Sequence, residues 1–86
     1  MTITQIRKLQ VKNGIAKLQA MIENGLAWKL EGHVGRQAMR ALEDGACFLP
    51  LKAIKDYWGN TVPARTMLQA GSKGTIENCT KYYEGL

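Results

Sequence analysis

Residues 2–25, TITQIRKLQVKNGIAKLQAMIENG, decide the fold of this chain. Thr2 stands three residues before Gln5, which is the spacing of a capping box, where each side chain satisfies a backbone N–H of the other residue at a helix start. Gly25 closes the segment, and glycine readily takes the left-handed conformation that ends a helix. The segment therefore predicts a helix that runs to Asn24.

Apolar residues lie on two sides of this predicted helix. One stripe has spacings of four, three and four residues: Val11, Ile15, Leu18 and Ile22. The second lies on roughly the opposite side: Ile6, Leu9, Ala16 and Ala20. Asn13-Gly14 offers a break into two shorter helices, but one glycine costs a helix only about 1 kcal/mol, so we expect one long helix weakened at Gly14. Because a helix with two apolar faces is either central in its domain or packed against another subunit, we also expect a homo-oligomer.

Glycine also closes the later segments of the chain, at Gly45, Gly71 and Gly85. Residues 34–44 predict a second helix, and residues 75–84 predict a last helix capped by Thr75, with Ile76, Cys79 and Tyr83 facing inward. Residues 26–32 alternate like a strand, but we expect Trp28 and Leu30 to anchor a loop in the core.

The middle of the chain, residues 46–74, carries weaker signals. Pro50 and Pro63 can each begin a short helix, the first ending at Gly59-Asn60 and the second at Gly71; the alternative is an irregular segment. The predicted fold is thus a small, mostly α, single domain over residues 1–86. It has a long N-terminal helix and an irregular or short-helical middle third.

Composition places the chain among ordinary globular proteins. It has 86 residues, of which 45% are hydrophobic and 22% charged, with a net charge of +5. No apolar run approaches the roughly 18 residues that span a membrane, and the polar, basic start shows no secretory signal, so a cytoplasmic protein is expected. The basic excess lies in residues 1–24 and 47–74, and it favours anionic partners or simply keeps a small protein in solution.

The catalytic inventory is poor, so the sequence predicts a protein that is not an enzyme. His33, the one histidine, is expected at the surface, and Cys47 and Cys79 are expected as free buried thiols. The carboxylates occupy charged, turn-like or helix-surface positions, and no nucleotide-binding or metal-ligand motif occurs. We expect no cofactor and no metal site.

Residues 71–75, GSKGT, form one candidate binding site, at the start of the last predicted helix. Glycine backbone, the Ser72 and Thr75 hydroxyls and the Lys73 ammonium suit an anion at a helix N-terminus. The alternative is structural: Gly71 ends one helix, Gly74 makes a turn and Thr75 caps the next helix.

Residues 55–60, KDYWGN, mark the second candidate, with aromatic and basic side chains close together: Lys52, Lys55, Tyr57, Trp58 and Arg65. Such a set stacks bases and holds phosphates, or anchors a protein interface. The structural alternative makes Trp58 the main core aromatic, while Tyr57 is expected to be exposed.

In its size, basic charge and lack of catalytic groups, the chain resembles, in general character only, the short accessory proteins encoded by phages and plasmids. The expected function is binding without catalysis, with three candidates. The first is an accessory protein or inhibitor acting on a protein partner through residues 52–73. The alternatives are a nucleic-acid-binding module and a protein that sequesters a small anionic, nucleotide-like ligand at residues 71–75.

Overall fold

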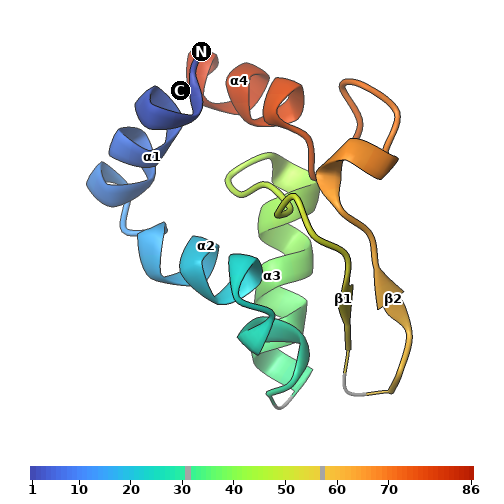
Figure 1. Cartoon of the computed structure of the whole chain (residues 1–86). Helices are drawn as coiled ribbons and strands as arrows, with labels where there is room; N and C mark the ends of the chain where they lie inside the picture. The colour runs from blue at the N-terminus through green and yellow to red at the C-terminus, as the bar shows by residue number, and fades with distance from the viewer. Residues whose placement is uncertain (31, 57) are drawn as a thin grey trace.

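The protein is mostly α-helical, with a single two-stranded ribbon in the part of the chain that the computed structural model describes, residues 1–30, 32–56 and 58–86. In chain order the elements are α1 (Ile3–Lys12), α2 (Ala16–Glu23), the 3-10 helix η1 (Leu26–Trp28), α3 (Gly32–Asp44), β1 (Ile54–Lys55), β2 (Thr61–Val62), the 3-10 helix η2 (Arg65–Met67) and α4 (Ile76–Glu84). Figure 1 shows the helices on one side of the molecule and the β1–β2 ribbon extending along the other.

The predicted capping box is present, but the predicted long helix is wrong. Thr2 Oγ1 accepts the N–H of Gln5, whose Oε1 accepts the N–H of Thr2. The first helix ends at Lys12 because Gly14 takes the left-handed conformation, with φ of 74°. The Asn13 side chain also donates to the Leu9 carbonyl at 2.7 Å. Two short helices therefore replace the one long helix. The alternative, a break at Asn13-Gly14, is confirmed.

The second and last predicted helices are confirmed as α3 and α4. Thr75 caps α4 by accepting the N–H of Asn78, and Cys79 and Tyr83 are buried, with Ile76 packed beside them. Trp28 packs against the core as expected. Leu30 does not, because 43% of it is exposed.

The short helix expected from Pro50 to Trp58 is not formed. Ile54 pairs with Val62 in an antiparallel ribbon, since β-branched side chains favour pleated pairing. The Asp56 side chain bonds nearby backbone N–H groups, an arrangement that competes with helix formation. Of the helix expected after Pro63, only the one-turn η2 forms.

A buried segment, residues 45–50, runs between the helices and is the centre of the fold. It is not part of a sheet, so its backbone needs other partners. The two glutamines at 10 and 19 supply them: Gln10 Nε2 donates to the Ala46 carbonyl at 3.0 Å, and Gln19 both donates to the Phe48 carbonyl and accepts the Phe48 N–H, each at 3.0 Å.

Other elements complete the hydrogen bonding of this segment. The Tyr83 hydroxyl donates to the Ala46 carbonyl at 2.7 Å. The Leu49 N–H donates to the Gly74 carbonyl at 2.9 Å, and the Leu49 carbonyl accepts from Arg65 Nη1 at 2.9 Å. The segment thus ties α1, α2, α4 and the chain after the ribbon to one another.

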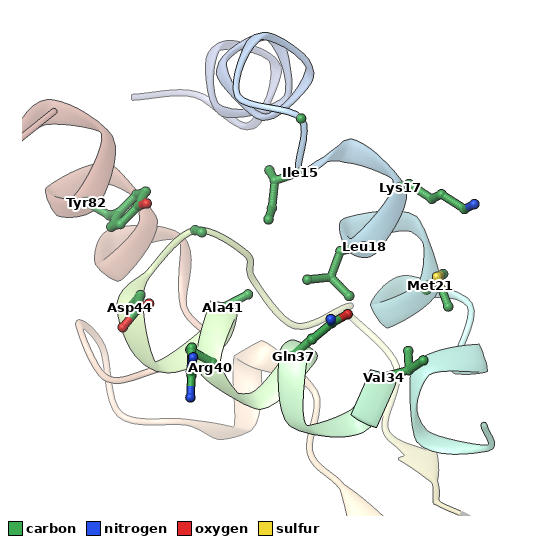
Figure 2. Close-up of a pocket in the computed structure, with 12 residues that line it drawn as sticks. Ile15, Lys17, Leu18, Met21, Val34, Gln37, Arg40, Ala41, Asp44 and Tyr82 are labelled. Atoms are coloured by element: carbon green, nitrogen blue, oxygen red, sulfur yellow. The ribbon is translucent and has the colours of Figure 1, made fainter. Parts of the chain in front are cut away.

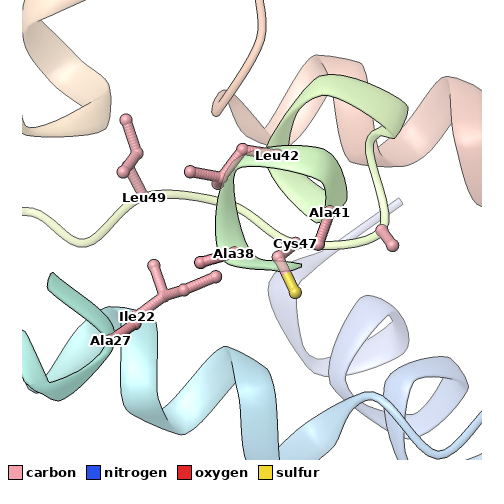
Figure 3. Close-up of a cluster of buried hydrophobic side chains, with 8 residues drawn as sticks. Ile22, Ala27, Ala38, Ala41, Leu42, Cys47 and Leu49 are labelled. Atoms are coloured by element: carbon pink, nitrogen blue, oxygen red, sulfur yellow. The ribbon is translucent and has the colours of Figure 1, made fainter. Parts of the chain in front are cut away.

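The buried segment contributes side chains to two apolar clusters. The larger one joins α2, η1, α3 and the buried segment, and its labelled members converge in Figure 3: Ile22, Ala27, Ala38, Ala41, Leu42, Cys47 and Leu49. The smaller one joins α1 and α4 around Phe48: Ile6, Phe48, Cys79 and Tyr83. Ile15, Leu18 and Ile22 of the first predicted stripe reach the larger cluster, and Ile6 and Leu9 of the second reach the smaller one. The expectation of two continuous apolar faces is only partly met, because Val11 is 69% exposed and Ala20 is also exposed.

Candidate functional site

The turn between β1 and β2 is held by its own hydrogen bonds. Asp56 Oδ1 accepts the N–H groups of Trp58, at 2.9 Å, and Asn60, at 2.8 Å. The Asp56 N–H donates to the Asn60 carbonyl, and the Gly59 N–H donates to the Asp56 carbonyl. Gly59 has a φ of 83°, which glycine adopts without strain. One carboxylate and one glycine therefore hold Asp56 and residues 58–60 in a defined arrangement.

Trp58 projects from this turn, with 80% of its surface exposed. The interpretation of Trp58 as the main core aromatic is wrong: Phe48, which is 0% exposed, has that place. Tryptophan is highly buried on average, so such an exposed indole is unusual. Tyr57, the neighbouring candidate, lies outside the described residues.

The base of the ribbon is anchored to the helices. Val62 packs against the larger cluster, and Ile54 lies against Gly25, where a Cβ would come within 2.9 Å of the Ile54 side chain. On the other side of the ribbon, Lys55 Nζ donates to Thr61 Oγ1 at 3.0 Å. The ribbon therefore has an anchored face and a solvent face, and Lys55 belongs to the latter.

The cations predicted around Trp58 do not share one role. Lys52 and Lys55 are exposed beside the ribbon. Arg65 is half-buried: it bonds the Leu49 carbonyl, and its guanidinium lies 5.4 Å from the centroid of the Phe48 ring. Arg65 is therefore part of the folded scaffold.

Residues 71–75 are held by contacts within the protein. Ser72 Oγ donates to the Gln69 carbonyl, and Thr75 Oγ1 to the Ser72 carbonyl, each at 2.6 Å. The N–H of Gly71 lies 3.4 Å from a carboxylate oxygen of Glu77, and the N–H groups of Ser72 and Thr75 donate to the Gln69 and Ser72 carbonyls. These three N–H groups and two hydroxyls thus serve the turn itself.

Lys73 is exposed, and Gly74 is buried with a φ of 91°. The Gly74 carbonyl pairs with the Leu49 N–H, so this loop is joined to the buried segment, residues 45–50. Figure 1 shows the loop between η2 and α4 at the opposite end of the ribbon from the β1–β2 turn. Lys73 is therefore not gathered with Trp58 at the turn.

A hollow of about 400 Å³ adjoins Trp58 and is lined also by Trp28, Lys29, Leu30, Gly35 and Asp56 among others. The Trp28 Nε1–H is buried and has no acceptor among the described residues. Leu30 is 43% exposed here. The hollow thus places apolar surface next to the exposed indole.

A larger groove, of about 550 Å³, lies between α2 and α3 and was not predicted from the sequence. Figure 2 shows Ile15 and Leu18 of the α2 segment and Ala41 of α3 directed toward this space, with Tyr82 of α4 at one end. The sequence signal was present as the stripe containing Ile15 and Leu18. The sequence predicts instead that this stripe packs in the interior of the domain or against a second subunit.

Neither thiol is placed for chemistry. Cys47 and Cys79 are free and 0% exposed, and burial raises the pKa of each to about 12. A thiol with so high a pKa is a poor nucleophile at neutral pH. Among the described residues, no three histidine, cysteine, aspartate or glutamate side chains are grouped to hold a metal ion. His33 is exposed, as predicted.

Comparison with protein-family models, with curated proteins and with solved structures finds no significant match to this chain. In the described part of the chain, none of the helices has the length and apolar content needed to cross a membrane.

Proposed function

We propose that this chain is a non-enzymatic, cytoplasmic binding protein that acts on a protein partner, as an accessory protein or inhibitor of the phage or plasmid type. The contact surface is the ribbon turn centred on Trp58, with Lys52 and Lys55 beside it. The observation that carries the proposal is the 80% exposure of Trp58 on a turn that Asp56 holds in shape.

An exposed indole on a preformed turn favours binding for two reasons. Tryptophan is enriched among the residues that dominate binding energy at protein interfaces. A loop that is already ordered loses less conformational entropy when it binds. The hydrogen bonds of Asp56 to the N–H groups of Trp58 and Asn60 provide such order.

The surroundings of the turn suit an acidic partner. Leu30, which lines the hollow beside Trp58, is 43% exposed. Lys52 and Lys55 add positive charge beside the ribbon. A partner with an apolar pocket rimmed by carboxylates would complement these side chains.

Nucleic acid is the second candidate because a base stacks on an exposed indole and a phosphate pairs with a neighbouring lysine such as Lys55. A protein partner is preferred because Arg65 is committed to the Leu49 carbonyl, and Lys73 lies in the loop at the other end of the ribbon. Two further proposals are that residues 71–75 bind a small anionic, nucleotide-like ligand and that the chain forms a homo-oligomer.

The decisive experiment captures partners from the host cell with the wild-type chain, with Trp58→Ala and with Val11→Ala. Val11 is a matched control because it is apolar, 69% exposed and on α1. We expect to capture a partner that both the wild type and Val11→Ala retain. When this partner and the chain are purified, its affinity for Trp58→Ala is expected to be at least tenfold lower than for the wild type.

The same three proteins are titrated with single-stranded DNA, RNA, nucleotides and sulfate at two salt concentrations. Binding to an oligonucleotide that falls steeply with salt and depends on Trp58 would replace the protein partner by nucleic acid. If Trp58→Ala captures the partner as well as the wild type does, the turn is not part of the contact surface. Light scattering on the free chain decides its oligomeric state.

A further inference from the structure

The groove between α2 and α3 is lined at helical intervals from both sides. Along α2 and its N-cap the apolar side chains that line the groove are Ile15, Leu18 and Met21, three residues apart, and Gly14 and Lys17 line the same side. Along α3 the lining residues include Val34, Gln37 and Ala41. Because these spacings follow the turns of the two helices, the groove is a trough that follows helix surfaces.

The floor of the trough is apolar and only partly covered. Ile15, Leu18, Met21 and Val34 pack against the larger cluster, yet each remains half-buried. Part of each side chain therefore faces the open volume of about 550 Å³. An apolar surface that covered this floor would be stabilised by its removal from water.

The rim of the trough is charged, with an excess of positive charge. Lys17 and Arg40 border it, together with one acidic residue, Asp44, and all three side chains are exposed. Among the described residues the one ion pair is that between Arg7 and Glu23, so the rim charges are not paired with one another. Two cations against one anion favour a partner with acidic flanks.

Shape decides between the possible occupants. A second copy that docked through the same face would present the same hollow, and two concave faces enclose a void when they meet, which packing disfavours. An α-helix is a convex rod about 10–12 Å across with its side chains, and it fills a trough between two helices by the helix-in-groove mode of recognition.

We propose that the α2–α3 groove binds an amphipathic helix of a partner protein, with apolar residues along one stripe and carboxylates on both sides of it. This site is separate from the ribbon turn and goes beyond the function proposed above. The helix places its apolar stripe on Ile15, Leu18 and Met21, and its carboxylates meet Lys17 and Arg40.

The test uses the full chain and a panel of fluorescein-labelled helical peptides. Each peptide carries leucine, isoleucine, methionine or phenylalanine at positions one turn apart, flanked in one series by glutamate and in the other by lysine. Fluorescence anisotropy measures affinity, and backbone amide chemical shifts locate the contact. We expect at least one glutamate peptide to bind at ten times lower concentration than its lysine counterpart, with shifts at Leu18, Met21 and Gln37.

A charge reversal tests the recognition directly. Lys17→Glu with Arg40→Glu inverts the rim and is expected to reverse the preference, so that lysine peptides bind at least tenfold more tightly than glutamate peptides. Lys8→Glu with Lys81→Glu is the matched control: both residues are exposed, lie on α1 and α4 outside the groove lining, and change the net charge equally. The control is expected to keep the preference for glutamate peptides.

Three results would overturn the proposal. The first is that no peptide of either series binds. The second is that the control reverses the preference as fully as the groove variant, which would make the effect one of net charge. The third is that another occupant holds the groove: either light scattering shows a dimer that Lys17→Glu with Arg40→Glu dissociates, or dodecanoate binds there and displaces the peptide. None of these results bears on Trp58, so the ribbon-turn proposal is tested independently.

Discussion

Gln10 and Gln19 meet in the interior of the protein, where Gln10 Nε2 donates to Gln19 Oε1 at 2.8 Å and each residue is 1% exposed. Both amides also bond the backbone of the buried segment, at Ala46 and Phe48. Buried polar groups are stabilising only when they are paired. The pair therefore acts as a side-chain substitute for a neighbouring strand.

Replacing Gln19 by alanine is expected to destabilise the protein by about 3 kcal/mol, because it leaves the Phe48 N–H, the Phe48 carbonyl and part of the Gln10 amide without partners. The melting temperature should fall by roughly 12–24 °C at this chain length. Gln37→Ala, at an exposed position on α3, is the control and is expected to change stability by less than about 0.5 kcal/mol. Equal melting temperatures for the two variants would contradict the strand-substitute role.

Gly74 and Gly71 offer a matched comparison within one turn. Both have positive φ, 91° and 83°, so alanine at either position is strained by about 1–2 kcal/mol. A Cβ at Gly74 would also lie 2.8 Å from Leu49 Cδ1, whereas at Gly71 nothing lies within 4 Å. We therefore expect Gly74→Ala to cost at least about 1.5 kcal/mol more than Gly71→Ala, owing to overpacking of the buried Leu49. Chemical denaturation measures the difference, and equal losses would show that the contact relaxes freely.

Arg7 and Glu23 join α1 to α2 across the break, with bonds of 2.9 and 2.7 Å. The hydrogen bond from Arg7 holds the pKa of the Glu23 carboxyl below its ordinary value of 4.5. The contribution of the pair is therefore complete above about pH 4.5 and is lost as the pH falls through the lowered pKa. Because both side chains are partly exposed, we expect the pair to stabilise the folded protein by less than about 1 kcal/mol. Glu23→Gln should match the wild type at low pH and be less stable near pH 7; a constant difference at all pH values would contradict this.

Because both thiols are buried, we expect the protein to lose stability at alkaline pH. Burial raises the folded-state pKa of Cys47 and Cys79 from 9.0 to about 12, so the unfolded chain releases protons first. Stability is unaffected below about pH 9 and decreases as the pH rises toward 12, by up to about 1.4 kcal/mol per pH unit for each thiol. Cys79→Ala should lower stability near neutral pH through its cavity but make the decrease above pH 9 less steep. An unchanged slope would exclude this thiol as its cause.

Several elements follow from local rules that act over a few residues. The Thr2–Gln5 capping box, the Thr75 cap and the inward positions Cys79 and Tyr83 could be predicted, because caps and helical periodicity depend on neighbours in the chain. The mostly α class follows from the same signals. The candidate residues Lys52, Lys55 and Trp58 were also found in this way, through their composition and closeness in sequence.

Other features depend on contacts between distant residues. Whether Gly14 weakens a helix or ends it was decided by the buried segment, because Gln10 and Gln19 reach its backbone from two separate helices. The β1–β2 ribbon replaced a predicted helix because Ile54 could pair with Val62 and lie against Gly25.

The amino-acid sequence by itself determined the capped starts of α1 and α4, which residues are apolar and which candidate side chains are available, since these are properties of short stretches of chain. Only the tertiary structure decided that Trp58 is exposed while Phe48 is buried, that Arg65 belongs to the scaffold, and that a groove opens between α2 and α3. The reason is that burial and hydrogen-bond pairing are shared among segments far apart in sequence, and each segment alone is compatible with more than one arrangement.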